Sequence, residues 1–199
     1  MLTPDIRLQA ARALYEAELA RKPIPQLSKT HPEMTLEDAY AVQGLWAQMK
    51  IDKGARRVGT KIGLTSRAMQ MASKFNEPDF GFLMDDMLYN DGAQIKVDRF
   101  MLPRLEVELA FILGEDLEGP TARIYDVMRA TELVVPACEI IDYRTETPDS
   151  SITPFFDRVA PTQRTSMSIG RNTRPPTTMA AAAALSAMVS TIWRGVSVR

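Results

Sequence analysis

The sequence predicts an α+β fold in which N-terminal helices precede a mixed, β-rich region. Apolar residues recur at helical spacing up to about residue 53, and from Arg57 onward short apolar segments alternate with turn-forming residues. The chain has 199 residues, of which 45% are hydrophobic and 25% charged, enough for a sizeable core. We expect a helical region at 1–56, a partial β-rich domain at 57–147 and an atypical tail at 148–199.

Two helices are predicted in the first region. Thr3, followed by a proline, is typical of a helix start and predicts a helix over residues 4–21. Thr35 and Asp38 resemble a capping box and predict a second helix that ends near residue 53, before a glycine.

The second region is predicted to combine strands with short helices. Residues 58–64 form a short apolar segment bounded by glycines, which indicates a strand, and Ser66 is placed to cap a helix that runs to about residue 74. The remaining predictions are turns at 77–81 and 90–92, strands near 93–97, 104–114 and 133–142, and a helix near 124–128.

Charge and cysteine content exclude several function classes. The net charge of −1 gives no electrostatic reason to expect nucleic acid or an anionic membrane as a partner. One cysteine, Cys138, fits a reducing compartment, and the N-terminus lacks a signal-peptide pattern, so we expect a cytoplasmic protein. With a single histidine, His31, a histidine-based triad or metal site is not expected.

Two glutamates, Glu106 and Glu108, lie inside the apolar run of residues 105–113. In a strand, side chains two residues apart point to the same face, so both carboxylates converge on one spot. Neighbouring like charges are unfavourable unless a cation lies between them, and a divalent metal ion satisfies this requirement. The alternative is a pair of rim glutamates that bind Arg104 or Arg144.

A third acid, Glu139, is central to a second apolar run, residues 134–142. Three carboxylates without imidazole or thiolate favour Mg²⁺ or Mn²⁺ over zinc. The pattern alone leaves the metal site and the rim glutamates equally open.

Further candidate residues precede the glutamates. Lys61 is predicted in a strand between glycines, as an acid/base or charge stabiliser, or alternatively as a solvated edge lysine. Asp79 is placed to orient a water or relay a proton, or alternatively to cap a turn. Gly63 and Leu64 lie just before a predicted helix, and the backbone N–H groups at the start of a helix can bind a carboxylate.

Four motifs together carry a family resemblance. They are residues 59–66, 77–81, 103–108 and 136–142, in this order. Together they resemble the hydratase/decarboxylase branch of the fumarylacetoacetate hydrolase superfamily, over about residues 5–145. The resemblance implies a fumarylacetoacetate-hydrolase-like fold, incomplete at the C-terminus.

The resemblance also implies roles for the candidate residues. The metal ligands would be Glu106, Glu108 and Glu139, with Mg²⁺ or Mn²⁺ as the ion. Lys61 and Asp79 match the acid/base positions, and Gly63 and Leu64 match the loop that faces the substrate. The implied activity is hydration of a 2-oxo-4-enoate, or of its 2-hydroxy-2,4-dienoate tautomer, in aromatic-compound catabolism, giving a 4-hydroxy-2-oxo acid. The alternatives are a related 4-oxalocrotonate-type decarboxylase and an inactive truncated homologue. A small 2-oxo acid would be the substrate partner, and a family-type homo-oligomer is a further expectation.

The tail departs from this pattern. Residues 158–199 contain six arginines but no Asp, Glu or Lys, so the rest of the chain carries a net charge of −7. Such a shift is what a changed reading frame in GC-rich DNA produces, and we expect a frameshift product. We also expect poor order up to about residue 177, followed by a helix over 179–193. A surface or partner-packed helix is favoured there over a membrane anchor, because the stretch is short for a membrane span.

Overall fold

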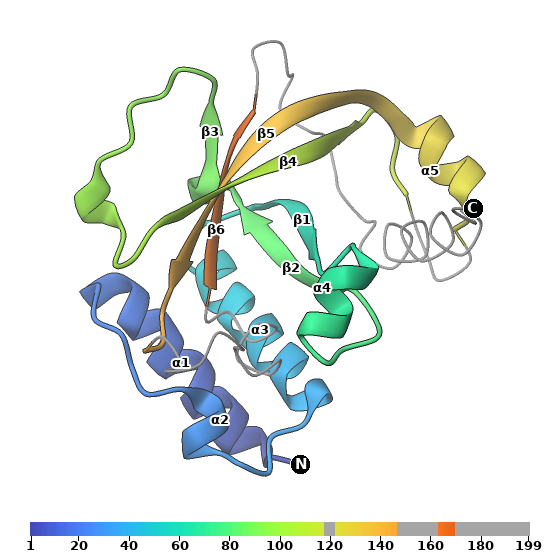
Figure 1. The fold of residues 1–199 in the computed structure, drawn as a ribbon. Helices are drawn as coiled ribbons and strands as arrows, with labels where there is room; N and C mark the ends of the chain where they lie inside the picture. Colours follow the sequence, from blue (N-terminus) through green and yellow to red (C-terminus); the bar gives the residue numbers. More distant parts are fainter. Residues whose placement is uncertain (118–121, 147–162, 170–199) are drawn as a thin grey trace.

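A computed structural model describes residues 1–117, 122–146 and, as backbone only, 163–169. Its elements are shown in Figure 1 and run in the order α1 (Pro4–Ala20), α2 (Leu27–Thr30), α3 (Leu36–Ile51), β1 (Arg57–Gly63), α4 (Arg67–Ala72), β2 (Asp79–Met84), the 3₁₀ turn η1 (Asp85–Met87), β3 (Leu88–Asn90), the 3₁₀ turn η2 (Val97–Arg99), β4 (Arg104–Leu113), α5 (Ile124–Ala130), β5 (Thr131–Tyr143) and β6 (Gln163–Ile169). The order confirms the predicted α+β class.

The two long helices begin where the sequence predicts. The Thr3 side chain accepts a hydrogen bond from the Ile6 backbone N–H at the start of α1, and a proline follows it. At α3 the Thr35 side chain accepts from the Asp38 N–H while the Asp38 carboxylate accepts from the Thr35 N–H. This reciprocal pair is a capping box and satisfies two helix-end donors.

The strands form two sheets. β1 and β2 make an antiparallel pair, and the larger sheet has the order β3-β6-β5-β4. β4 pairs antiparallel with β5 over its whole length, β6 is antiparallel to β5, and β3 is parallel to β6. β4 therefore lies at one edge of the larger sheet, and β1 and β2 lie below it in Figure 1.

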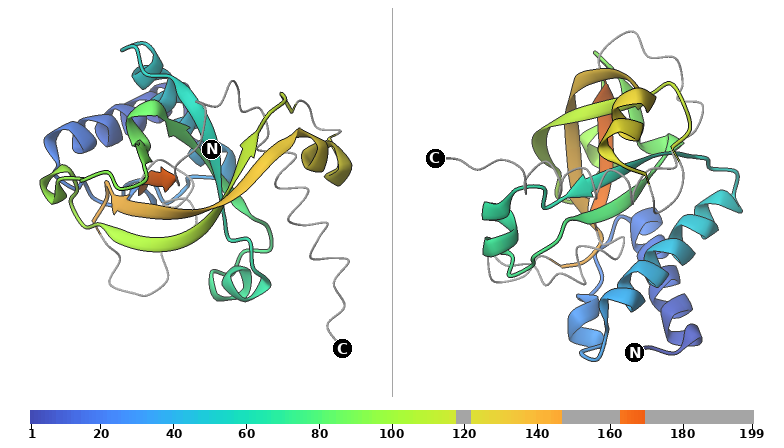
Figure 2. Two further views of the ribbon diagram at one scale, coloured as in Figure 1. Left: turned by 90° about the horizontal axis from the view of Figure 1, so that it is seen from above. Right: turned by 90° about the vertical axis from the view of Figure 1, so that its right-hand side faces the viewer.

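The largest hydrophobic core lies between the helices and β2. Buried side chains of α1 and α3 pack with Met84, the last residue of β2, with Met87 of η1 and with Leu64. Figure 2 shows α1 and α3 side by side on one side of the sheets. Among the residues that the structure describes, no helix combines the length and the apolarity that a membrane span requires.

Three sequence predictions are wrong. Residues 93–97 form no strand, because the chain there leaves the turn at 91–92 irregularly and enters η2. Asp79 belongs to β2, since its backbone pairs with Gly63, rather than to a turn. Residues 163–169 form strand β6 and pair with β5, although poor order was expected there. The predicted helix over 179–193 lies outside the described residues.

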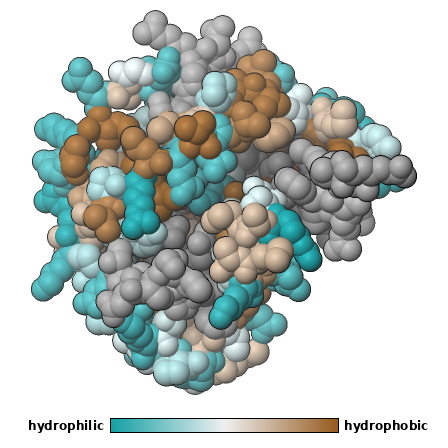
Figure 3. All heavy atoms as spheres, viewed as in Figure 1, coloured by the Kyte–Doolittle hydropathy of each residue, from teal (hydrophilic) through white to brown (hydrophobic). Residues whose placement is uncertain are grey.

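The two faces of β4 have opposite environments. Glu108 and Ala110 are on the inward face, where Ala110 packs with Leu83 of β2. Val107, on the outward face, is 90% exposed, and Leu105 and Leu109 on either side are also exposed. In Figure 3 apolar surface lies along the upper half of the molecule, where Figure 1 draws β4 and β5.

Candidate metal centre

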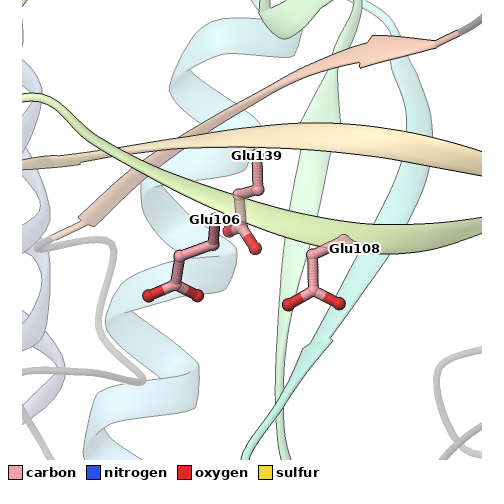
Figure 4. A group of neighbouring side chains, drawn as sticks. All are labelled: Glu106, Glu108 and Glu139. Atoms are coloured by element: carbon pink, nitrogen blue, oxygen red, sulfur yellow. The ribbon is translucent and has the colours of Figure 1, made fainter.

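The pairing of β4 with β5 brings the three glutamates together. Glu106 is the direct cross-strand partner of Glu139, and Glu108 follows two residues later on the same face of β4. Figure 4 shows all three carboxylates pointing to the same side of the two strands. We call Glu106, Glu108 and Glu139 the carboxylate cluster.

The geometry of the carboxylate cluster suits a hard divalent ion. One carboxylate oxygen from each glutamate lies within 4.8 Å of the other two. Mg²⁺ takes six oxygen ligands at about 2.1 Å, which places adjacent ligands roughly 3.0 Å apart and opposite ligands roughly 4.2 Å apart. The three side chains would therefore close toward a bound ion by up to about 1.8 Å, and their all-oxygen donors fit Mg²⁺ or Mn²⁺.

Burial and charge make the carboxylate cluster electrostatically costly without a cation. Glu139 is only 3% exposed, while Glu108 is half-buried and Glu106 exposed. Burial raises the pKa of Glu108, and the negative charges of Glu139 and Glu106 raise it further. The positive charge of Lys61 lowers the pKa of Glu108.

Lys61 brings a positive charge into contact with the carboxylate cluster. Its Nζ lies 2.8 Å from Oε1 of Glu139, and its side chain is 19% exposed. Lys61 is therefore not a solvated edge lysine. The two arginines considered as alternative partners lie elsewhere: the Arg144 guanidinium binds Glu18, and that of Arg104 lies 5.6 Å from the ring of Tyr143.

Arg144 belongs to a separate group of charges beneath the sheet. Glu18 accepts hydrogen bonds from Lys50 at 2.9 Å and from Arg144 at 2.7 Å, and Lys50 also binds Asp86 at 2.9 Å. Both cations lie over the ring of Trp46. We call Glu18, Lys50, Asp86 and Arg144 the buried ion network; it joins α1, α3 and η1 to the end of β5.

The face of β1 and β2 that carries Lys61 also carries Asp79. Lys61 pairs across the strands with Gly81, and Gly63 pairs with Asp79, so all four residues share one face. A Cβ added at Gly63 would collide with the Asp79 carboxylate, and one at Gly81 would press on the Lys61 stem. The two glycines thus leave room for the two charged side chains.

The loop after β1 holds an uncommon backbone conformation. Leu64 has φ of 53°, in the left-handed region that bulky residues rarely adopt. The Gln70 side chain donates to the Leu64 carbonyl at 2.9 Å, and Ser66 caps α4 as predicted. Gly63 ends β1, the strand that carries Lys61, and Leu64 begins the short loop that leads to α4.

Two residues near the site had no assigned role in the sequence analysis. Tyr40 of α3 stacks on Phe80, with ring centroids 4.3 Å apart. Burial, together with the charges of Asp79 and Glu77, raises the pKa of Tyr40 to about 12. From the spacing of apolar residues in α3, the sequence could have predicted that Tyr40 faces β2, but it could not have predicted the contact with Phe80.

The second is Asp142, which is buried in β5. Its carboxylate accepts hydrogen bonds from the backbone N–H groups of Met101, at 3.0 Å, and Leu102, at 2.6 Å. These bonds fix the chain just before β4 and therefore help to set the position of Glu106 against β5. In the sequence, the only sign of this role was that Asp142 is an acidic residue at the end of an apolar run.

No protein-family model matches the chain, but sequence comparison finds similar proteins. It is 52% identical over 134 residues to the 2-oxo-hept-4-ene-1,7-dioate hydratase of Escherichia coli. The matched region covers 67% of this chain and 50% of that protein. It is 43% identical over 143 residues to the 2-keto-4-pentenoate hydratase of Paraburkholderia xenovorans. The matched region there covers 72% of this chain and 53% of that protein. The chain thus spans about half the length of the curated relatives it matches.

A solved structure agrees with the sequence relatives. The 4-oxalocrotonate decarboxylase of Pseudomonas putida G7, complexed with magnesium and adipate, matches with a TM-score of 0.78 and 31% identity, over 85% of this chain and 64% of that one. Over about two thirds of its length, the chain is similar to the hydratases and decarboxylases of this family. The predicted resemblance and the predicted fold are both confirmed.

Proposed function

We propose that the site catalyses the metal-dependent hydration of a 2-oxo-4-enoate, or of its 2-hydroxy-2,4-dienoate tautomer, in aromatic-compound catabolism. Water adds a hydroxyl group at C4 and a proton at C5, and the product is a 4-hydroxy-2-oxo acid. The observation that carries the proposal is the carboxylate cluster with Lys61 at its edge. The 52% identity to a hydratase of this substrate class supports it.

The carboxylate cluster would hold the metal ion. Magnesium is bound in the related decarboxylase, and the donor set here fits Mg²⁺ or Mn²⁺. When bound, the ion supplies a Lewis acid for the 1-carboxylate and 2-oxo oxygens of the substrate. The depth of Glu139 on the inward face keeps this ligand away from bulk water.

Lys61 and Asp79 would move the protons. Both lie on one face of β1 and β2, and Lys61 reaches the carboxylate cluster, so an ammonium and a carboxylate border the same space. In this proposal Lys61 exchanges a proton with the substrate and Asp79 orients the water that attacks C4. Gly63 and Leu64 face the substrate, and the absence of a side chain at Gly63 leaves the Asp79 carboxylate in place.

A second candidate is decarboxylation of a 4-oxalocrotonate-type substrate. The structural match to a decarboxylase and a 37% identity to the 4-oxalocrotonate decarboxylase of a Pseudomonas strain favour it. The same site would then stabilise the enolate left by loss of CO₂.

One assay separates these candidates. Purified chain is mixed with a 2-oxo-4-enoate or a 4-oxalocrotonate-type acid in the presence of Mg²⁺, while ultraviolet absorbance and CO₂ release are followed. Hydration without CO₂ supports the hydratase, CO₂ release supports the decarboxylase, and no turnover with either acid supports an inactive homologue. Lys61→Ala should lower turnover by about 10²-fold, the usual contribution of a general acid or base.

The setting of the reaction is part of the same proposal. A cytoplasmic location agrees with a chain that has one cysteine. A homo-oligomer of the family type is expected, and light scattering coupled to size-exclusion chromatography tests it.

A further inference from the structure

We propose that Lys61 sets the charge of the ion that the carboxylate cluster accepts, favouring a divalent ion over a trivalent one. The inference rests on the proposed metal site and adds a determinant of ion selectivity to it. It starts from the contact between Lys61 Nζ and Glu139 Oε1, which measures 2.8 Å.

Charge balance gives the first step. Three carboxylates carry three negative charges, and the Lys61 ammonium returns one, so these four side chains leave two negative charges. A divalent ion neutralises this remainder, whereas a trivalent ion leaves a surplus positive charge. Without the ammonium, the same three carboxylates match a trivalent ion.

Position gives the second step. Lys61 is mostly buried and its contact is with Glu139, the deepest of the three glutamates. Any ion held by Glu139 therefore has the ammonium as a neighbour in a partly desolvated space. Charge interactions are screened less there than at the surface.

The dependence on ion charge gives the third step. Repulsion between the ammonium and a bound ion is proportional to the charge of the ion. Removing the ammonium therefore favours a trivalent ion by one and a half times as much, in free energy, as it favours a divalent ion. If Mg²⁺ affinity rises about tenfold, Tb³⁺ affinity rises roughly thirtyfold.

The test is calorimetric titration of the complete chain with Mg²⁺ and with Tb³⁺ at pH 8. The variant Lys61→Met keeps the length of the side chain but removes its charge. We expect Mg²⁺ to bind about tenfold more tightly and Tb³⁺ roughly thirtyfold more tightly than in the unmodified chain. Lys61→Arg keeps the charge and should keep the original selectivity, as should Lys29→Met at an exposed position in α2.

Thermal unfolding provides a second readout if Lys61→Met folds poorly. Lys61→Met removes the contact between the ammonium and the buried Glu139, so the melting temperature of the metal-free variant should fall, and Mg²⁺ should raise it by more than in the unmodified chain. Unchanged or weaker binding of both ions by Lys61→Met, with Glu106→Gln still lowering Mg²⁺ affinity by about 100-fold or more, would overturn the selectivity role and leave the metal site intact. No ion binding by the unmodified chain would overturn both.

Discussion

The buried ion network and the carboxylate cluster each combine four charged side chains, once Lys61 is counted with the cluster, but they are balanced differently. In the buried ion network, two carboxylates face two cations, so these four side chains have a net charge of zero, and the more exposed Arg99 approaches Asp86 at 3.9 Å. In the cluster, three carboxylates face one lysine. A group that balances its own charge can be purely structural, because each charge has a partner in the protein. A group that does not is unfavourable until something from outside completes it, and this difference separates scaffold from site.

The largest expected effect is on the buried ion network. Replacing Arg144, which is fully buried, by Met removes the guanidinium that binds Glu18 and should lower the free energy of unfolding by about 3–5 kcal/mol. Urea unfolding followed by circular dichroism measures it. Arg56→Met is the control, since its side chain is 78% exposed and its ion pair should contribute less than about 1 kcal/mol. Equal losses for both variants would remove the distinction between the network and an ordinary surface pair.

The carboxylate cluster should respond in the opposite way. Glu106→Gln removes one of three mutually repelling charges, so the metal-free chain should be as stable as before or slightly more stable. Its affinity for Mg²⁺ should fall by about 100-fold or more, because one of the three proposed ligands is lost. Calorimetric titration with Mg²⁺ and urea unfolding with a chelator present measure the two effects. Glu16→Gln, an exposed change on α1, should alter neither. A large loss of metal-free stability in Glu106→Gln would mean that the cluster is part of the scaffold.

Acid should weaken the helical part of the scaffold through Asp38. Burial alone would raise the pKa of this carboxyl, but hydrogen bonds from the Thr35 N–H, the Arg7 guanidinium and the Leu2 N–H hold it well below its usual range. A lowered pKa means that the carboxylate stabilises the fold fully above the unfolded-state pKa of about 3.9, and that this contribution is lost as pH falls below it.

Urea unfolding at pH 7 and pH 3 tests the role of Asp38. Asp38→Asn should cost about 2 kcal/mol at pH 7, because charge-assisted hydrogen bonds are lost, and about 1 kcal/mol less at pH 3, because each pH unit below the unfolded-state pKa removes about 1.4 kcal/mol. Asp91→Asn, at an exposed turn, should show no such dependence. A cost that stays constant with pH would assign the effect to packing instead of charge.

The sequence predicted much of the site because strand alternation is local. The spacing of Glu106 and Glu108 places them on one face whatever the rest of the fold does, and the motif around Glu139 added the third acid. Alternation identifies the two faces of β4 but not which one is inward. That depends on β1 and β2, which bring Lys61 to Glu139 across 78 residues of sequence.

The helices were predicted by their caps, whereas contacts between distant segments were not. Nothing near Arg144 in the sequence points to Glu18, which is 126 residues away. Strand β6 was missed because its pairing with β5 is decided by that neighbour and not by its own composition. The frameshift interpretation of residues 148–199 stays a prediction, which the nucleotide sequence downstream of codon 147 tests.

The smallest expected effects come from two glycines, one on each side of the comparison. Gly44 lies inside α3 with no atom within 4 Å of an added Cβ, so Gly44→Ala should stabilise the chain by about 0.5–1 kcal/mol through helix propensity alone.

At Gly63 the added Cβ collides with the Asp79 carboxylate, which has to move. Turnover should fall by about tenfold in Gly63→Ala, because a displaced group loses its orientation toward the substrate. Urea unfolding and the hydration assay are applied to both variants. If Gly63→Ala keeps full turnover, the position of Asp79 does not matter to the chemistry, and Asp79 belongs with the scaffold.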